Sequence, residues 1–294
     1  METTSLKEAT RVAETTGVLS EMNLEKKDDV ISGTLTLQTG EETFITYRAY
    51  AKKLTKDGKE NSIYKGLETV MNEYVSIAGA KDSEDVEPTV VYVKGQIAPS
   101  SFYSKTGELV ESMQFASNFF NRAKGEDPEF GSTFEAEIYI KAIRPEVSTD
   151  EETRGEETGR IIVDGYLPLY NGAIEPISLI APAEDGIADV VVDMFEAGQT
   201  VCFDGDIINT MHIETKTIER AIGKPKVKKT TTWKNEMIIT GATDPYDEEK
   251  AYTKEVIQAA LAARDEKLEA AKNKSNTEKP ATKKPAASGR KLNW

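Results

Sequence analysis

The sequence predicts a mainly β protein with some α+β character, built from two copies of one small β domain. Two short segments recur in the same order: residues 33–37 (GTLTL) are echoed by residues 165–169 (GYLPL), and residues 91–97 (VYVKGQI) by residues 201–207 (VCFDGDI). Internal repetition of this kind constrains the fold strongly. The length of 294 residues also accommodates two domains of about 100 to 150 residues with tails.

The first half predicts three strands, one helix and two more strands. Apolar and polar residues alternate with the period of a β-strand in five stretches. Between the third and fourth of these, Ile63, Leu67 and Val70 recur at helical spacing. The expected strands are residues 18–24, 30–38, 43–54, 90–97 and 110–120, and the expected helix is residues 62–78.

The second half repeats this order. Asn171-Gly172 is a strong hairpin signal between its second and third strands. A Lys-rich loop over residues 218–232 is expected between the fourth and fifth. The expected strands are residues 133–143, 161–170, 173–180, 200–208 and 235–241, and the expected helix is residues 187–197.

A helix between strands three and four is typical of the oligonucleotide/oligosaccharide-binding (OB) barrel, a five-stranded Greek-key barrel. We therefore expect two tandem OB-like barrels, with any mixed α+β domain of similar size as the alternative. The chain then divides into a flexible N-terminus, two barrels, a helix and a disordered basic tail. The expected boundaries are residues 1–15, 16–130, 131–246, 247–273 and 274–294.

The composition gives little support to enzyme or metal chemistry. One cysteine and one histidine cannot form an intramolecular disulfide or a Cys/His zinc site. No phosphate loop, dinucleotide fingerprint or nucleophile elbow is present, so we expect no catalytic residue and no cofactor. Asp204 and Asp206 share a strand face and could hold a cation, but a solvated face is the more common role of such a pair. No metal site is therefore expected.

The N-terminus has no apolar signal core, and no apolar run reaches the roughly 20 residues of a membrane helix. We therefore expect a cytoplasmic protein without a membrane partner.

Binding of single-stranded nucleic acid is the better-supported class. Such proteins need cations for the phosphates and aromatic faces for the bases, each stacked base contributing about 1–3 kcal/mol. The net charge of −14 hides local basic stretches that could serve this purpose. The candidates in the first half lie on the third and fourth strands and the following loop: Phe44, Arg48, Tyr50, Lys52, Lys53, Tyr92, Lys94, Phe102, Tyr103 and Lys105. The alternative is that Phe44, Tyr50 and Tyr92 cover the barrel wall.

In the second half, basic residues gather between the fourth and fifth strands, where OB barrels have one of their binding loops. The candidates there are Lys224, Lys226, Lys228, Lys229 and Trp233. Such a segment would attract phosphates. A solvated loop, with the tryptophan capping the barrel, is the alternative.

Residues 92–97 (YVKGQI) and 102–107 (FYSKTG) resemble the corresponding segment of bacterial single-stranded DNA-binding proteins, and the doubled form resembles tandem-OB versions that phages encode. The resemblance implies a protein of the host cytoplasm that coats single strands in DNA replication, recombination or repair and recruits other proteins. Bacterial relatives carry an acidic tail, whereas this tail is basic and ends in Leu292-Asn293-Trp294, a candidate docking tip for replication or recombination proteins.

Two other functions remain open from the sequence. One is a non-catalytic protein-interaction or phage assembly module built on OB barrels, which the acidic total charge favours. The other is RNA binding, which the sequence cannot separate from DNA binding.

Overall fold

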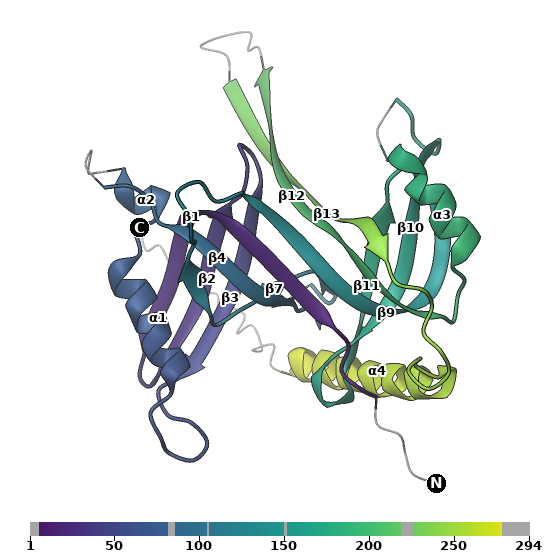
Figure 1. Cartoon of the computed structure of the whole chain (residues 1–294), viewed down its shortest axis with the longest axis horizontal. Helices are drawn as coiled ribbons and strands as arrows, with labels where there is room; N and C mark the ends of the chain where they lie inside the picture. The colour runs from purple at the N-terminus through teal and green to yellow at the C-terminus, as the bar shows by residue number, and fades with distance from the viewer. Residues whose placement is uncertain (1–5, 82–85, 105, 150–151, 219–225, 278–294) are drawn as a thin grey trace, which may run out of the picture.

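The computed structural model describes residues 6–81, 86–104, 106–149, 152–218 and 226–277, with side chains described outside residues 212–231 and 274–277. It is predominantly β-sheet with a few helices, as expected (Figure 1). Within the described chain, no helix is long and apolar enough to cross a membrane.

Thirteen strands are present in the described chain, and eleven of them form one sheet. The strands are β1 (Arg11–Lys27), β2 (Val30–Gln38), β3 (Phe44–Lys52), β4 (Val90–Ile97), β5 (Ser100–Tyr103), β6 (Leu109–Ser112), β7 (Phe115–Ala116), β8 (Phe120–Arg122), β9 (Gly131–Val147), β10 (Glu157–Pro168), β11 (Ile174–Ala181), β12 (Thr200–Ile218) and β13 (Lys226–Ala242). β5 and β6 form a separate two-stranded hairpin.

The pairings of the large sheet close into two rings. In the first ring, β1 pairs with β2, β2 with β3, β3 with β7, β7 with β4 and β4 with β1. In the second ring, β9, β10, β11, β13 and β12 are joined in the same order, and β12 pairs back with β9. β3–β7 and β11–β13 are parallel, and the other pairings of both rings are antiparallel.

The two rings are fused through β1 and β9, so the expectation of separate barrels is corrected to one continuous sheet. Arg11, the first residue of β1, faces Ala136, the sixth of β9, and Gly131, the first of β9, faces Thr16, the sixth of β1. The pairing register is therefore the same when it is counted from the start of either strand, as at the interface of a two-fold symmetric dimer.

The repeated sequence segments occupy equivalent places. Residues 33–37 and 165–169 fall in or directly after β2 and β10, and residues 91–97 and 201–207 lie in β4 and β12. The glycines shared by the last two segments are required by close approaches: a Cβ at Gly95 would lie 2.6 Å from Tyr47 Cε1, and one at Gly205 would lie 1.9 Å from the Ile238 carbonyl oxygen.

In the described residues, four α-helices lie around the sheet: α1 (Ser62–Glu73), α2 (Ile77–Ala80), α3 (Ile187–Met194) and α4 (Lys254–Thr277). α1 lies beside the first ring and α3 beside the second, at opposite ends of the molecule (Figure 1). Asn61 caps α1 by accepting the Ile63 N–H, and α1 packs Tyr64 and Leu67 into the core.

Several element boundaries differ from the expectation. Residues 11–15 belong to β1 and are not a flexible end, because Ala13 is buried and both edges of the strand are hydrogen-bonded. The expected helix over residues 62–78 breaks at Tyr74, whose backbone is extended.

Two other segments also differ. The strand expected over residues 110–120 divides into β6, β7 and β8. The Lys-rich loop expected over residues 218–232 is largely strand, because β12 and β13 continue as a long hairpin with Ile218 opposite Lys226. The basic tail lies outside the described residues, apart from the last turn of α4.

Candidate nucleic-acid interface

A groove crosses the first ring and holds aromatic and basic side chains together. It has a volume of about 810 Å³ and is lined by β2, β3, β4, β7 and residues 117–119. We call it the ring groove and define it by Arg48, Tyr50, Lys94, Asn118 and Phe119. Tyr50 is 53% exposed and Phe119 is 59% exposed, which is a large exposure for aromatic residues.

Strand alternation positions the β3 side of this groove. Ile45, Tyr47, Ala49 and Ala51 are buried in the core, so the intervening Arg48 and Tyr50 face outward. This confirms the predicted orientation of β3.

Residues 117–119 are held against β3 and β4 by hydrogen bonds. The Tyr50 N–H donates to Asn118 Oδ1 at 2.9 Å, and the Ser117 hydroxyl donates to the Lys94 carbonyl at 3.2 Å. Ser117 Oγ also accepts the Phe119 N–H at 3.1 Å. Phe119 is therefore presented on a backbone fixed at both sides, which lowers the entropic cost of using its ring for binding.

The β4 cation of the ring groove is already paired. Lys94 Nζ forms an ion pair with Glu14, and the Tyr92 hydroxyl donates to the other Glu14 oxygen at 2.9 Å. The hydrogen bond from Lys94 and the one from Tyr92 hold the pKa of Glu14 below its ordinary value despite partial burial. Lys94 and Tyr92 point outward as predicted, but both are engaged by this carboxylate.

Arg48 differs from Lys94 in its contacts. Within the described chain, no carboxylate is within ion-pair distance of its guanidinium, and Arg48 lines both the ring groove and a second cavity. An unpaired guanidinium offers five donors in a planar fork suited to phosphate oxygens.

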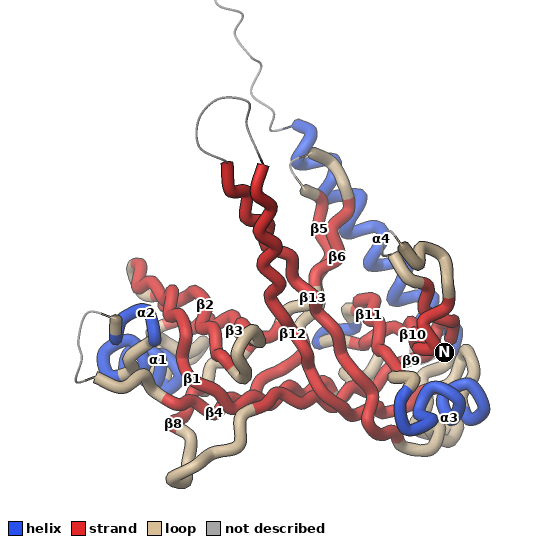
Figure 2. Tube along the Cα trace, turned by 90° about the horizontal axis from the view of Figure 1, so that it is seen from above, coloured by secondary structure: helices blue, strands red, loops and turns tan. Residues whose placement is uncertain are grey.

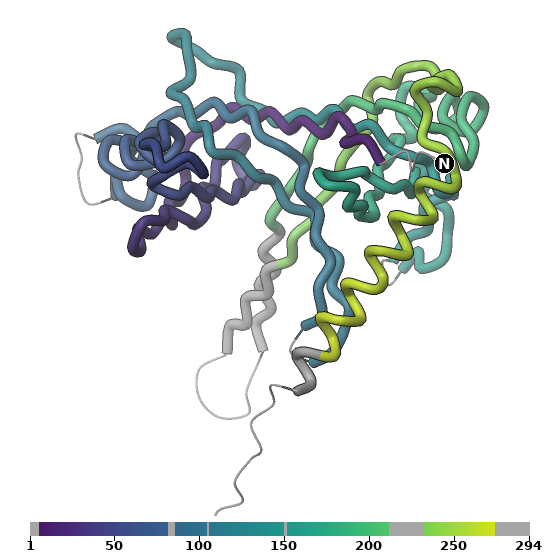
Figure 3. Tube along the Cα trace, turned by 90° about the horizontal axis from the view of Figure 1, so that it is seen from below, coloured from purple at the N-terminus to yellow at the C-terminus, as the bar shows by residue number. Residues whose placement is uncertain are grey.

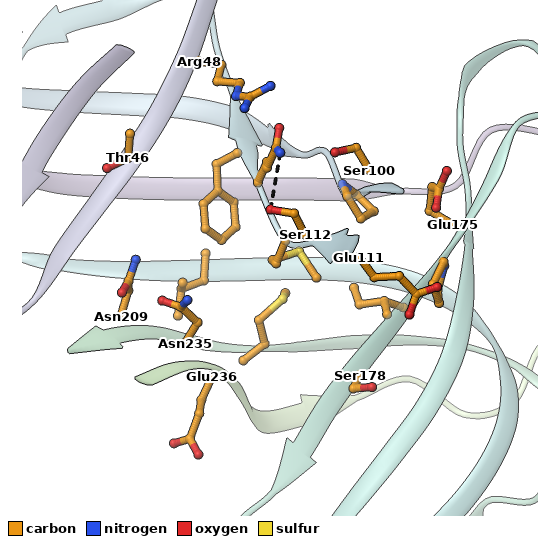
Figure 4. A pocket seen from close by; sticks show the side chains of 18 of the residues that line it. Thr46, Arg48, Ser100, Glu111, Ser112, Glu175, Ser178, Asn209, Asn235 and Glu236 are labelled. Carbon is orange, nitrogen blue, oxygen red and sulfur yellow. Dashed lines mark hydrogen bonds between the residues drawn. The ribbon is translucent and has the colours of Figure 1, made fainter. Parts of the chain in front are cut away.

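The second cavity has a volume of about 490 Å³ and lies where the first ring and the β5–β6 hairpin meet β11, β12 and β13 of the second ring (Figure 4). We call it the hairpin cavity. The β5–β6 and β12–β13 hairpins project from the same side of the sheet, and α4 runs beside β5–β6 (Figures 2 and 3). The β12–β13 hairpin reaches the first ring, because the Met211 N–H donates to the Glu42 carbonyl at 2.8 Å and Thr43 forms a β-bridge with Thr210.

Arg264 of α4 fixes the β5–β6 hairpin to the second ring. Its guanidinium donates to Glu175 of β11 at 3.0 Å, to Ser101 of β5 at 2.6 Å and to Glu111 of β6 at 3.0 Å. Burial opposes the charge of Arg264, but the Glu175 and Glu111 carboxylates outweigh it and raise the pKa. One side chain thus joins the hairpin, the second ring and the C-terminal helix.

The remaining predicted site residues whose side chains are described do not line the ring groove. Phe44 contacts Trp233, which is 52% exposed. Phe102 is exposed on β5, and Lys272 lies over the Tyr103 ring, 5.0 Å from its centroid. Lys52 and Lys53 are exposed at the end of β3, where Lys53 pairs with Asp29 at 3.7 Å.

The basic segment is only partly described. Lys226, Lys228 and Lys229 lie in β13 with backbone alone described, whereas Lys105 and Lys224 lie outside the described residues.

Among the cavity residues that sequence reasoning missed are Asn118 and Phe119 of the ring groove and Asn209 and Asn235 of the hairpin cavity. The Phe119-Phe120 doublet was a usable signal, because two adjacent aromatics interrupt strand alternation. Phe120 is buried and Phe119 is exposed.

Asp204 and Asp206 line a third cavity together with Glu14 and Glu135. This third cavity is therefore an acidic surface, which would repel an anionic ligand.

The fold and these cavities define a two-ring β protein with an aromatic and basic groove on one ring and two hairpins beside it. The chain belongs to the YorF family, whose model matches residues 10–274. No curated protein matches the sequence.

Among solved structures, the chain is similar to the wild-type single-stranded DNA-binding protein of Thermus aquaticus, with 10% identity and a TM-score of 0.43 over 82% of this chain and 95% of that one. A deletion mutant of the same protein gives 10% identity and a TM-score of 0.44 over 82% and 97%.

Proposed function

We propose that this protein is a non-catalytic single-stranded DNA-binding protein with little dependence on base sequence. The observation that carries the proposal is the ring groove, where the half-exposed rings of Tyr50 and Phe119 lie beside the guanidinium of Arg48, which pairs with no carboxylate of the described residues. Base stacking on such rings tolerates sequence because every base has a π face, and a guanidinium meets phosphates.

The strand order supports the ring groove as the nucleic-acid-binding site. We propose that each ring is an OB barrel, since the order β1–β2–β3–β7–β4 and the parallel closing pair β3–β7 follow the Greek-key order of that fold. OB barrels bind nucleic acids on the face of strands two and three and at the loop between strands four and five. The ring groove occupies the first position, and the β5–β6 and β12–β13 hairpins occupy the second in their respective rings.

A role in phage DNA replication, recombination or repair, and recruitment of partner proteins by the C-terminal tail, are further parts of this proposal. They rest on the sequence resemblance to single-stranded DNA-binding proteins. RNA is the competing ligand, because stacking and phosphate contacts serve both nucleic acids.

Tryptophan fluorescence tests the proposal directly. In a Trp294→Phe variant, Trp233 is the only tryptophan. Titration with oligo-dT and with oligo-U at low salt should quench its emission, and the affinity should fall steeply as salt is added. Tighter binding of oligo-U would assign the site to RNA. An unchanged emission, together with no band shift at low salt, would contradict binding of either nucleic acid.

A matched pair of variants locates the site. Tyr50→Ala combined with Phe119→Ala should weaken oligo-dT binding by about tenfold or more, since two stacking platforms are lost. Tyr170→Ala is the control, because Tyr170 is 68% exposed but does not line the ring groove. Equal loss in both would show that the effect is not specific to the groove.

A protein-interaction module is the second candidate. The acidic total charge and the half-exposed Val190 and Met194, one turn apart on α3, favour it. Absence of nucleic-acid binding at low salt would support this candidate over the first.

A further inference from the structure

We infer that the hairpin cavity receives one base of the bound strand and selects adenine and cytosine, whose exocyclic amino groups stand where guanine and thymine have a carbonyl oxygen. The inference rests on the proposed function and deepens it. The ring groove would then bind the strand without discriminating between bases. The hairpin cavity would add a preference for particular bases at one nucleotide.

The size and lining of the cavity suit a single base. Its volume of about 490 Å³ lies within the range typical of small-molecule sites. Phe115, Met113, Met237 and Ile177 supply apolar surface, alongside polar side chains that include Ser112, Asn209 and Asn235 (Figure 4). A flat base inserted there would bury its faces against apolar atoms and leave its edge for hydrogen bonding.

Two amide side chains provide that hydrogen bonding. Asn209 of β12 and Asn235 of β13 are directly paired across the hairpin, so their side chains share one face, and both line the cavity. Figure 4 shows them next to each other at one side of it.

Asn209 has an unusual feature. Its Oδ1 atom is buried, and no group in the described chain donates a hydrogen bond to it. Buried polar atoms are nearly always hydrogen-bonded, so an unsatisfied acceptor on a side chain that lines a cavity points to a donor that a bound ligand supplies once the amide turns toward it.

The identity of the base follows from the donor that Oδ1 requires. Adenine presents its N6 amino group and cytosine its N4 amino group, whereas thymine has the O4 carbonyl at the corresponding position. A carbonyl there would face the Asn209 oxygen without a hydrogen bond. Asparagine is also the residue that commonly pairs with the N6 and N7 atoms of adenine.

The two cavities are continuous in their lining. Thr34 and Arg48 belong to both the ring groove and the hairpin cavity. A strand stacked on Tyr50 and Phe119 would bring a phosphate to Arg48, and a base next to that phosphate could turn into the hairpin cavity.

Paired oligonucleotides test the inference on the unaltered protein. Oligo-dT strands carry one central adenine or its carbonyl counterpart hypoxanthine, and one central cytosine or its counterpart uracil. Each amino base should bind about tenfold more tightly than its carbonyl counterpart, as expected for loss of one base-specific contact. Equal affinities within both pairs would overturn the inference while leaving the proposed function intact. No binding to any of the strands would overturn both.

Variants then test whether Asn209 is responsible for the base preference. Asn209→Ala should abolish the amino preference while oligo-dT binding persists, and Asn121→Ala should leave both unchanged. Asn121 is an exposed amide of β8 that lines neither cavity. An amino preference that survives in Asn209→Ala would overturn the assignment of that preference to Asn209. The thermal unfolding midpoint of each variant confirms that it is folded.

Discussion

The ring of Phe44 meets the ring of Trp233 edge to face, with centroids 6.2 Å apart and planes inclined by 78°. Phe44 begins β3 of the first ring, and Trp233 lies in the β12–β13 hairpin of the second. The contact therefore joins the hairpin of the second ring to the first ring.

Phe44→Ala should loosen the hairpin. Aromatic pairs contribute about 0.5–1.5 kcal/mol beyond the area they bury, so the global stability should fall only modestly. In a Trp294→Phe background, the emission of Trp233 should shift to longer wavelength because its ring becomes more hydrated. Phe102→Ala, an exposed aromatic on β5, is the control. An unshifted Trp233 spectrum would contradict the contact.

Arg48→Ala should weaken oligo-dT binding and change its salt dependence. Each phosphate contact to a single strand contributes about −0.7 to the slope of log K against log salt. Loss of Arg48 should make the slope less negative by about that amount. Lys124→Ala removes an exposed cation that lines neither cavity and is the control. An unchanged slope for Arg48→Ala would show that Arg48 does not contact phosphate.

Glu14→Gln should strengthen binding. Lys94 is held by the Glu14 carboxylate, whose pKa is lowered by the hydrogen bonds from Lys94 and Tyr92, so Glu14 is ionised at neutral pH. Removing this charge frees Lys94 for phosphate, and affinity at low salt should rise a few-fold, with the gain disappearing at high salt. Glu21→Gln, on the same strand and exposed, should have little effect. Weaker binding in Glu14→Gln would contradict a competing role for Glu14.

Arg264→Ala should destabilise the hairpin side of the cavity. Hydrogen bonds to charged groups contribute about 1.5–3 kcal/mol each, and Glu175 would lose a partner at a site where it is largely shielded from water. We expect a lower unfolding midpoint and faster proteolysis within the β5–β6 hairpin. Arg264→Lys keeps the charge but not the planar fork, so it should give an intermediate result. Wild-type proteolysis rates in Arg264→Ala would rule out the three-way attachment.

Alkaline pH should destabilise the protein, partly through Cys202. Burial, followed by the neighbouring Glu135 carboxylate, raises the pKa of this thiol from 9.0 to about 12. The unfolded chain therefore ionises at lower pH than the folded one. The stabilising contribution is complete below about pH 9 and is lost as the pH rises towards the folded pKa.

Cys202→Ala removes this proton linkage. Between about pH 9.5 and 11, its unfolding free energy should fall less steeply than that of the unaltered protein, by up to about 1.4 kcal/mol per pH unit. Urea unfolding across this range measures the difference. Parallel curves for the two proteins would show that the folded-state thiol ionises normally.

Local patterns predicted much of the fold. The strand expected at residues 90–97 coincides with β4, and the expected outward positions of Arg48, Tyr50 and Lys94 are observed. Strand alternation and helical spacing depend on neighbours along the chain, so the sequence alone carries them. Phe119 and the continuation of the β12–β13 hairpin were missed, because the first depends on a short irregular segment and the second on cross-strand pairing of polar residues.

Local sequence patterns are enough to predict a mostly β chain with two repeated segments and with aromatic and basic residues on the outward face of β3. The three-dimensional packing adds that β1 and β9 pair into one sheet, that Glu14 forms an ion pair with Lys94, and that Asn209 lines a cavity and has a buried oxygen without a hydrogen-bond partner in the described residues. These features depend on which distant segments meet and in what register. Contacts between residues far apart in sequence are set by the packing of the whole chain, and a local pattern is compatible with many such arrangements.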